Sequence, residues 1–292
     1  KERWEEAVEI YKELEEIGEF AFYGCLNLKD AKLGSYLKSI GDYAFYKCSS
    51  LVSVELPRTV RTVGDSAYYK CTSLISVSFG SGIESIGEAA FSGCGALTSI
   101  ELPSSVKTVG SRAFYNCSNV TLLILGDGVE TIGDYAFYNI NKITRLVLPE
   151  GLVSVGDYAF RGCAGLTSVL INSSVEAIGA HAFYGCKQLT FYTSAEGPAE
   201  DWSGRWNSSF RPVVWGCTMS EDGAYVVSVT IGEGTITDQY AVNGIAAPER
   251  ADYTFAGWAT SPDAEVRFSA AELGNIAPGT TLYAVWTVAE AE

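Results

Sequence analysis

A repeat of 23 residues is the feature that most constrains what this chain can fold into. The words "IGDYAFYKC" begin at Ile40, and nearly the same words return at Ile132 and Val155. Counted from the Ile or Val before each glycine, units begin without insertion or deletion at Ile17, Ile40, Val63, Ile86, Val109, Ile132, Val155 and Ile178. A unit this short cannot bury its apolar side chains alone, so such units stack on one another. We predict that residues 17–192 form one array of eight repeats.

Each unit combines a strand-like half and a turn-like half. In "CSSLVSVELP", Leu51, Val54 and Leu56 follow an L-x-x-L-x-L spacing, whose last positions alternate as a short strand requires. Pro57 then ends the strand because it has no amide to donate. The half that contains "IGDYAF" is too short for a free-standing helix and fits one tight helical or extended turn, with Asp42 placed to cap it. Each unit is therefore predicted to be one coil of a solenoid.

The consensus as a whole resembles a known repeat family. The stretch "IGDYAFYKCSSLVSVELPRTV" is similar to the BspA-like leucine-rich repeats of bacterial surface proteins, and the resemblance covers residues 17–192. It implies a leucine-rich-repeat solenoid with parallel strands on one face and short turns or helical turns on the other. It also implies a secreted or cell-surface protein that binds partners and carries out no catalysis.

Seven of the cysteines occupy one repeat position. They are Cys25, Cys48, Cys71, Cys94, Cys117, Cys163 and Cys186. Ile140 fills the same position in another unit, which marks an apolar slot. Parallel Cβ vectors keep neighbours roughly 4.8 Å apart, beyond the roughly 3.5 to 4.5 Å that a disulfide prefers, and a line of thiols cannot surround a zinc ion. We expect buried free thiols and no metal or other cofactor; whether Cys217 is paired stays open.

Two further rows follow the repeat. Glu19, Asp42, Asp65, Glu88, Asp134 and Asp157 form an acidic row, interrupted at Ser111 and Ala180, which favours capping of each turn over calcium binding. Tyr23, Tyr46, Tyr69, Tyr115, Tyr138 and Tyr184 form a tyrosine row, interpreted as an amphipathic edge of the core, with stacking on a glycan or protein as the alternative. His181, the single histidine, has no nucleophile fixed beside it by any motif.

The strand positions that should point outward change character along the array. Polar residues such as Ser53 and Glu55 occupy them in the early units. Later units place Leu122, Ile124, Val147 and Leu170 there, with Arg145 beside them and Phe191 beyond. Contiguous exposed apolar groups near an arginine are typical of contact surfaces, so these six residues are the candidate partner-binding site. The alternatives are a patch covered by the cap or C-terminal domain, or a dimer surface.

Both ends of a solenoid must be closed, and the flanking sequences offer caps. Residues 1–16 place Trp4, Val8, Tyr11 and Leu14 at helical spacing, which predicts an N-terminal capping helix. Residues 193–220 lose the repeat and are rich in aromatic residues, which predicts a C-terminal cap in which "RPVVW" can add a last strand. Trp202 and Trp206 in this segment are also the weaker candidates for a glycan-binding platform.

Residues 221–292 read as a separate β-rich module. "AYVVSVTIGEG" and "TITDQYAVNG" alternate as strands do, and turn residues separate them from later β-branched and aromatic runs. The elements "YTFAGWATSPD" and "TTLYAVW" resemble the Listeria-Bacteroides repeat, which implies a small β-grasp-like domain. "IGEGTI" replaces the double-glycine turn of that family, and there is one copy. Trp258 and Trp286 are expected in its core, with the module as spacer or stalk.

Charge and composition narrow the possible partners. A formal net charge of −15 argues against nucleic acid and anionic lipid, and no apolar run approaches the length of a membrane span. Lys1 follows no initiator methionine or signal peptide, so we expect a mature or excised fragment. No nucleophile elbow, phosphate loop or metal-ligand pair occurs. We predict a non-enzymatic, adhesin-like protein that binds an extracellular protein of a host or neighbouring bacterium; the alternatives are a glycan-binding module and a structural envelope or stalk component.

Overall fold

The computed structural model describes residues 14–195 and 197–211, together with strands outside these ranges. Those strands are β1 (Ala7–Glu9), β18 (Val213–Val214), β19 (Thr218–Met219), β20 (Tyr225–Ile231), β21 (Gly234–Tyr240), β22 (Tyr253–Ala259) and β23 (Tyr283–Val288). The chain divides into two compact units. The first comprises residues 1–166, 174–188 and 199–209, and the second comprises residues 167–173, 189–198 and 210–292.

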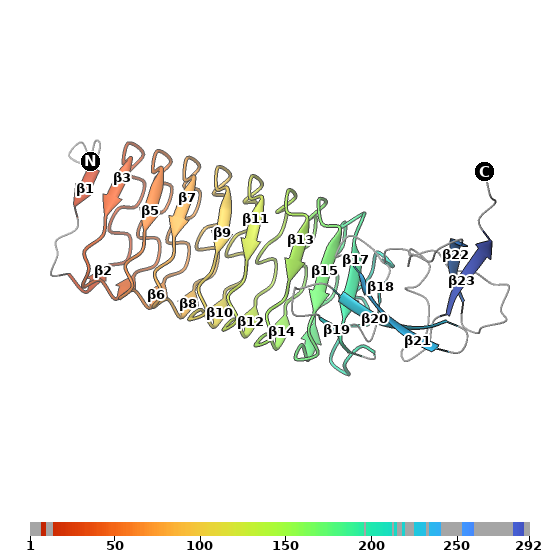
Figure 1. Cartoon of the computed structure of the whole chain (residues 1–292). Coiled ribbons are helices and arrows are strands. Elements are labelled where there is room, and N and C mark those ends of the chain that lie inside the picture. The colour runs from red at the N-terminus through yellow and green to blue at the C-terminus, as the bar shows by residue number, and fades with distance from the viewer. Residues whose placement is uncertain are drawn as a thin grey trace. The chain divides into compact units, whose positions relative to one another are not determined.

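The first unit is a stack of coils with two short strands in each coil (Figure 1). One strand of each coil lies on what we call the strand face. These strands are β1, β3 (Asp30–Lys32), β5 (Ser53–Glu55), β7 (Ser76–Ser78), β9 (Ser99–Glu101), β11 (Leu122–Ile124) and β13 (Arg145–Val147). The other strand precedes the turn. These are β2 (Glu16–Ile17), β4 (Ser39–Ile40), β6 (Thr62–Val63), β8 (Ser85–Ile86), β10 (Thr108–Val109), β12 (Thr131–Ile132), β14 (Ser154–Val155) and β16 (Ala177–Ile178).

Strand pairing follows the sequence period. On the strand face, β1, β3, β5 and β7 pair in that order, and β9 pairs with β11. The second sheet runs from β2 to β16 through all the even-numbered strands. All these pairs are parallel and join residues 23 positions apart, as in Ser53 with Ser76 and Ile40 with Val63. The predicted leucine-rich-repeat solenoid is therefore confirmed.

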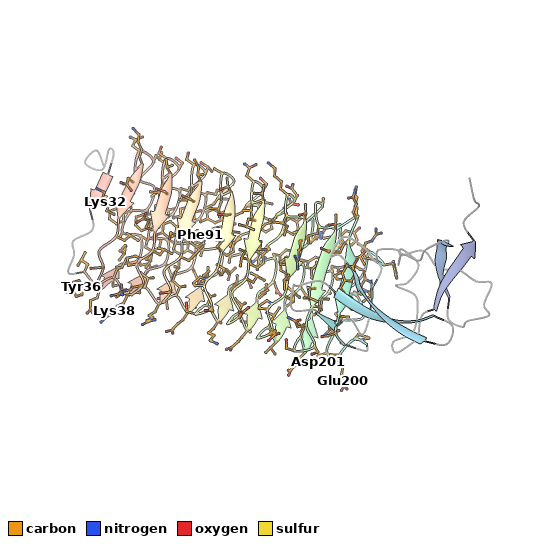
Figure 2. The ribbon with its side chains drawn as sticks, in the orientation of Figure 1. Lys32, Tyr36, Lys38, Phe91, Glu200 and Asp201 are labelled. Carbon is orange, nitrogen blue, oxygen red and sulfur yellow. The ribbon has the colours of Figure 1, made fainter. Side chains whose placement is uncertain are left out.

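The core consists of columns in which most coils place the same type of side chain. Ala44, Phe45, Cys48 and Leu51 of one coil are fully buried, as are their equivalents in the following coils. The aromatic rings of the phenylalanine column stack with centroids 4.9 to 5.5 Å apart, and Figure 2 shows Phe91 within this stack. Each residue of the consensus therefore packs on its own copy in the next coil, which is why the consensus is repeated so closely.

The turn segments are stacked turns rather than helices. Their amides alternate between two kinds of acceptor. The amide of Tyr46 donates within the turn to the carbonyl of Tyr43, whereas the amide of Phe45 donates to Ala67 of the next coil. The residue three positions after each Ile or Val has a positive φ, including bulky residues such as Tyr43 (55°) and Tyr158 (57°). Because some amides of each turn donate hydrogen bonds to carbonyls of the next turn, a turn needs its neighbour in order to form.

The four aspartates of the acidic row cap these turns, but across coils. Asp42 Oδ1 accepts a hydrogen bond from the amide of Asp65 at 2.7 Å, and Asp157 Oδ1 accepts one from the amide of Ala180 at 2.6 Å. The predicted capping role is therefore confirmed for Asp42, Asp65, Asp134 and Asp157, with one change, since the capped amide lies in the following coil. Each of these carboxylates accepts a hydrogen bond from the coil that follows it. Ala180 can therefore end the row, because it only supplies the amide that Asp157 caps and does not have to supply an acceptor.

The N-terminal segment differs from the prediction. In place of the capping helix predicted for residues 1–16, Ala7–Glu9 forms strand β1, which pairs in parallel with β3. Glu16–Ile17, at the end of the same segment, forms β2. The helical prediction was wrong at these strands because Val8, Ile10, Leu14 and Ile17 also match the repeat, 23 residues before Ala31, Leu33, Leu37 and Ile40. Residues 7–9 form a strand rather than a helix because the open edge of β3 supplies hydrogen-bond partners that an isolated helix would lack.

At the far end of the first unit, residues 199–209 act as a cap. Trp202 Nε1 donates to the carbonyl of Val175 at 2.9 Å, and the amide of Ser203 donates to the carbonyl of Ile178 at 2.8 Å. The carbonyl of Arg205 accepts from the amide of His181 at 3.0 Å, as the carbonyl of Ala180 accepts from Tyr158 one coil earlier. The cap therefore imitates the turn of a further coil: it donates to the carbonyls of Val175 and Ile178 and accepts from the amide of His181.

The second unit contains three groups of paired strands. Strand β15 (Ser168–Ile171) pairs in parallel with β17 (Thr190–Thr193), and β17 pairs with β18, so the expected last strand at "RPVVW" is confirmed. Strands β19, β20 and β21 form an antiparallel sheet, and β22 pairs antiparallel with β23. These strands agree with the predicted β-rich module, whereas its β-grasp-like identity stays a prediction because most of its connecting segments lie outside the described residues.

Candidate binding face

The strand face presents one outward pair of residues from each coil. The middle residue of each strand points inward, as Val54, Ile100 and Leu123 do at exposed fractions of 7% or less. The flanking residues point outward. They are Asp30 and Lys32, Ser53 and Glu55, Ser76 and Ser78, Ser99 and Glu101, Leu122 and Ile124, and Arg145 and Val147. The face therefore divides into a polar part and an apolar part along the array.

The polar part is hollowed into a groove. Two adjoining cavities of about 580 and 540 Å³ share Ser53, Glu55 and Ser78 in their linings. Asp30 and Lys32 line the first cavity, and Glu101 lines the second. Serines leave space between the longer acidic side chains, which makes the groove acidic and rich in hydroxyl groups. We call it the serine groove; sequence reasoning did not single it out, although serines at successive outward positions were its signal.

The apolar part adjoins the serine groove directly. Strand β11 pairs with β9, so Leu122 lies beside Ser99 and Ile124 beside Glu101. The exposed fractions of Leu122 and Ile124 are 45% and 46%. In the next coil Arg145 is exposed and Val147 is partly exposed. The structure thus places four of the six candidate partner-binding residues on one surface, and we call Leu122, Ile124, Arg145 and Val147 the apolar patch.

The other two candidates do not reach this surface. Leu170 is 4% exposed and Phe191 is fully buried, so their inclusion in the patch was wrong. Every residue of β15 is buried, so both faces of this strand are covered. Phe191 points inward because β17 pairs with β15 at a spacing of 22 residues instead of 23, which aligns Phe191 with the inward-facing Val169. A one-residue shift exchanges the two faces of a strand.

The tryptophans proposed as a glycan platform are also buried. Trp202 and Trp206 are 7% and 8% exposed, and their rings meet edge to face at 4.9 Å. A sugar stacks on an accessible ring face, and neither ring offers one. This rules out the platform and confirms the alternative, closure of the open core, because exposed core residues at the end of a stack need an apolar cover.

The cysteine row is a column of neutral thiols. Six of its members are fully buried and Cys25 is partly exposed, and all seven are thiols that form no disulfide. Each buried Sγ–H donates to a carbonyl of the preceding coil, as Cys117 does to Phe91 at 3.3 Å. Burial raises the pKa of Cys48 and of Cys117 to about 12, so neither is a thiolate near neutral pH. These thiols are packing groups; Cys217 lies outside the described residues.

In the part of the chain that the structure describes, no group of three or more His, Cys, Asp or Glu side chains is placed to hold a metal ion. No described helix has the length and apolar character that crossing a bilayer requires.

Comparison with known proteins agrees with this architecture. A leucine-rich-repeat protein from T. pallidum is 33% identical over 55% of this chain and 77% of its own, with a TM-score of 0.51. A leucine-rich-repeat protein from Bacteroides ovatus is 28% identical, with the same TM-score. The match covers 64% of this chain and about half (55%) of that protein's length. A search of curated protein sequences gave no significant match.

The family itself is identified by its sequence profile. The profile of the BspA-type leucine-rich-repeat region matches in six copies, over residues 5–121 and 84–197. These residues make up more than half of the chain and coincide with the coils described above. The chain belongs to the BspA-type leucine-rich-repeat family.

Proposed function

We propose that this protein is a non-enzymatic, extracellular binding protein and that its strand face binds another protein. The single observation that carries the proposal is the exposure of Leu122 and Ile124 beside an acidic groove. Aliphatic side chains at these exposed fractions leave apolar area in water, and burying such area drives protein association. Aliphatic groups offer no ring face to a sugar, which favours a protein over a glycan on this surface.

The chemistry of the face indicates the kind of partner segment. The serine groove contributes the carboxylates of Asp30, Glu55 and Glu101 against one ammonium group, that of Lys32. A complementary segment would place basic side chains in this groove and apolar side chains on the apolar patch. The outward residues follow one another coil by coil, so the face suits contact along an extended segment rather than chemistry at one point. An extracellular location is supported by the resemblance to surface proteins.

Selection of peptides from a random display library against the purified chain tests this proposal. We expect the selected peptides to combine apolar residues with Lys or Arg. Replacing Leu122 and Ile124 together by Asp should weaken their binding at least tenfold, because the central apolar contact is lost and two carboxylates are added. Val153→Asp is the matched control, since Val153 is 40% exposed but lies outside the strand face. Selected peptides that bind the double variant as tightly as the parent would refute the proposal.

A further inference from the structure

The second cavity of the serine groove, which has a volume of about 540 Å³, reaches down to apolar residues. Its lining includes Glu55 of one coil, Ser76, Val77, Ser78 and Phe79 of the next, and Glu101 of the coil after that. We call this cavity the Ser78 pocket. Val77 is partly exposed at the middle of its strand, whereas Val54 and Ile100 are buried at the same position in the adjoining coils. The pocket therefore opens onto a residue that the neighbouring coils bury.

Phe79 is the residue that distinguishes this coil. It occupies the repeat position of Leu56 and Leu102, which are buried, and is itself partly exposed. Its ring meets the rings of Phe91 and Phe114, in the two following coils, edge on with centroids 5.6 and 6.3 Å apart. Because a phenyl ring is larger than the side chain of leucine, the same neighbours cover it less completely. The floor of the Ser78 pocket thus consists of Val77 and the ring of Phe79.

The hydrogen bonding of the strand face is interrupted at the same place. Strand β7 is the last strand of one parallel sheet, and β9 in the next coil belongs to another sheet (Figure 1). The amide of Leu56 donates to the carbonyl of Ser78 at 2.9 Å, and that of Leu102 donates to Ile124 at 2.9 Å. Within the described residues, no equivalent bond joins Phe79 to Glu101. The Ser78 pocket therefore lies where the sheet is discontinuous.

Carboxylates flank the Ser78 pocket, and the described part of the chain does not pair them. Glu55 lies beside Ser78 in the strand register, and Glu101 lines the pocket from the following coil. The ion pairs between adjoining coils use other acidic residues, such as Glu84 with Arg61. No ion pair among the described residues includes Glu55 or Glu101. The pocket thus combines two carboxylates, serine hydroxyl groups and an apolar floor.

An arginine side chain matches this combination better than a lysine side chain does. A guanidinium group is planar and has donors along its edges, so it can donate to carboxylates on two sides at once. An ammonium group is compact and more strongly hydrated, so it gains less from leaving water. The aliphatic stem of arginine can pack on Val77 and Phe79 while its charged end stays among polar groups. The cation of the serine groove itself, Lys32, lines the other cavity.

We propose that the Ser78 pocket binds one arginine side chain of the partner protein, with the guanidinium group between Glu55 and Glu101 and the stem on Val77 and Phe79. This inference rests on the proposed function, because it assigns the central contact of the basic part of the partner segment. Apolar residues of the same segment continue onto the apolar patch, since Ile124 lies beside Glu101. The pocket therefore fixes the register in which the segment lies on the strand face.

Titration of the full chain with the blocked tripeptides Gly-Arg-Gly and Gly-Lys-Gly tests the proposal. The methyl NMR signals of Val77 report binding at the floor of the pocket. We expect the arginine peptide to shift these signals and to bind about fivefold more tightly than the lysine peptide, because only a guanidinium group can bridge both carboxylates. Added salt should weaken the binding, since the contact joins exposed charges.

Changes to the pocket should weaken binding of the arginine peptide selectively. Glu55→Gln and Glu101→Gln each remove one charge at nearly constant shape, and we expect each to weaken binding about threefold or more. Glu176→Gln is the matched control at an exposed residue outside the strand face, and should leave the affinity within about twofold of the parent. Ser78→Arg should abolish the shift by filling the pocket with the chain's own guanidinium group. Lys32 occupies the repeat position of Ser78 in another coil, so a long basic side chain is compatible with the fold there.

Three results would each overturn the proposal. They are unshifted Val77 signals with the arginine peptide, equal affinity for the lysine peptide, and parental affinity in both Glu55→Gln and Glu101→Gln. Neither tripeptide carries an apolar side chain for the apolar patch. Failure here, with library peptides still dependent on Leu122 and Ile124, would therefore remove the arginine site and leave the proposed function standing. Binding of the arginine peptide, with library peptides indifferent to Leu122 and Ile124, would keep the arginine site and remove the apolar patch from the proposed function.

Discussion

Cys117 illustrates how a single residue is constrained by stacking. Its side chain is fully buried, its thiol donates to Phe91 of the preceding coil, and burial raises its pKa to about 12 from an ordinary value of 9.0. In the next coil Ile140 occupies the equivalent slot, also fully buried. The slot thus selects for apolar volume, and cysteine satisfies it because a neutral thiol behaves as a small hydrophobic group.

The raised pKa predicts that Cys117 resists alkylation. At pH 8 a thiol with a pKa of about 12 is thiolate in roughly one molecule in 10⁴, so iodoacetamide should leave it unmodified while the denatured chain reacts fully. Mass spectrometry of digested peptides measures this, with the partly exposed Cys25 as internal comparison. Because the folded-state pKa lies above the unfolded value, the neutral thiol stabilises the fold fully below pH 9, and this contribution is lost as pH rises towards 12. Rapid modification of folded Cys117 at pH 8 would contradict this account.

At the scale of the element, the turn is defined by its contact with the neighbouring turn. A Cβ added to Gly64 would lie 2.5 Å from Asp42 Oδ1 and 2.7 Å from the amide nitrogen of Asp42. Asp42 Oδ1 is also the acceptor for the amide of Asp65. At Gly64, Gly87, Gly156 and Gly179 the glycine therefore provides the close approach that lets an aspartate carboxylate cap the next coil.

Gly64→Ala should consequently destabilise the solenoid by about 1 to 3 kcal/mol, as overpacking at a rigid contact does. Chemical denaturation followed by circular dichroism measures the change in the free energy of unfolding. Gly18→Ala is the control at the same repeat position in the first of these turns, where an added Cβ meets nothing within 4 Å. Equal losses in the two variants would show that the cost comes from something other than the contact with Asp42.

The positions of the strands were predicted well from the sequence, but the direction in which their side chains point was not always predicted correctly. Leu122 and Ile124 face outward as expected because their coils keep the 23-residue period. Leu170 and Phe191 do not, since one strand is covered on both faces and the next is shifted by one residue. Periodicity in a sequence predicts which residues occupy equivalent positions in successive coils. Whether those residues are exposed or buried also depends on segments distant in the sequence, which no local pattern reveals.

At the scale of the whole molecule, the first unit is a one-dimensional stack in which each coil contacts its two neighbours. Strand pairs run in a single order from β2 to β16, and each pair repeats the same offset. Stability in such an array approximates a sum over coils and their interfaces, so whole coils can be removed without loss of the architecture.

Deletion of residues 63–85, which is one whole repeat, should therefore give a folded protein. Thr62 then joins Ile86 in the place of Val63, so the rows of the core remain in register. We expect native-like circular dichroism and a free energy of unfolding for the solenoid lower by roughly one part in eight. Deletion of residues 63–74 is the control, because half a repeat puts every later row out of phase. If both deletions unfold the chain equally, the stack is not modular in this sense.

The sequence by itself determined the period, the contents of each core slot, the turn positions and the outward-facing strand residues of the regular coils. It could do so because every internal coil has the same two neighbours, so one consensus describes one environment. Only the tertiary structure decided the secondary structure, side-chain direction and burial of residues at the two ends of the stack, where the neighbours of a coil change. Ala7–Glu9 became a strand because β3 offered an edge, and Phe191 turned inward because the pairing of β15 with β17 is shifted by one residue. Trp202 and Trp206 were buried because the end of the stack exposed core that needed covering.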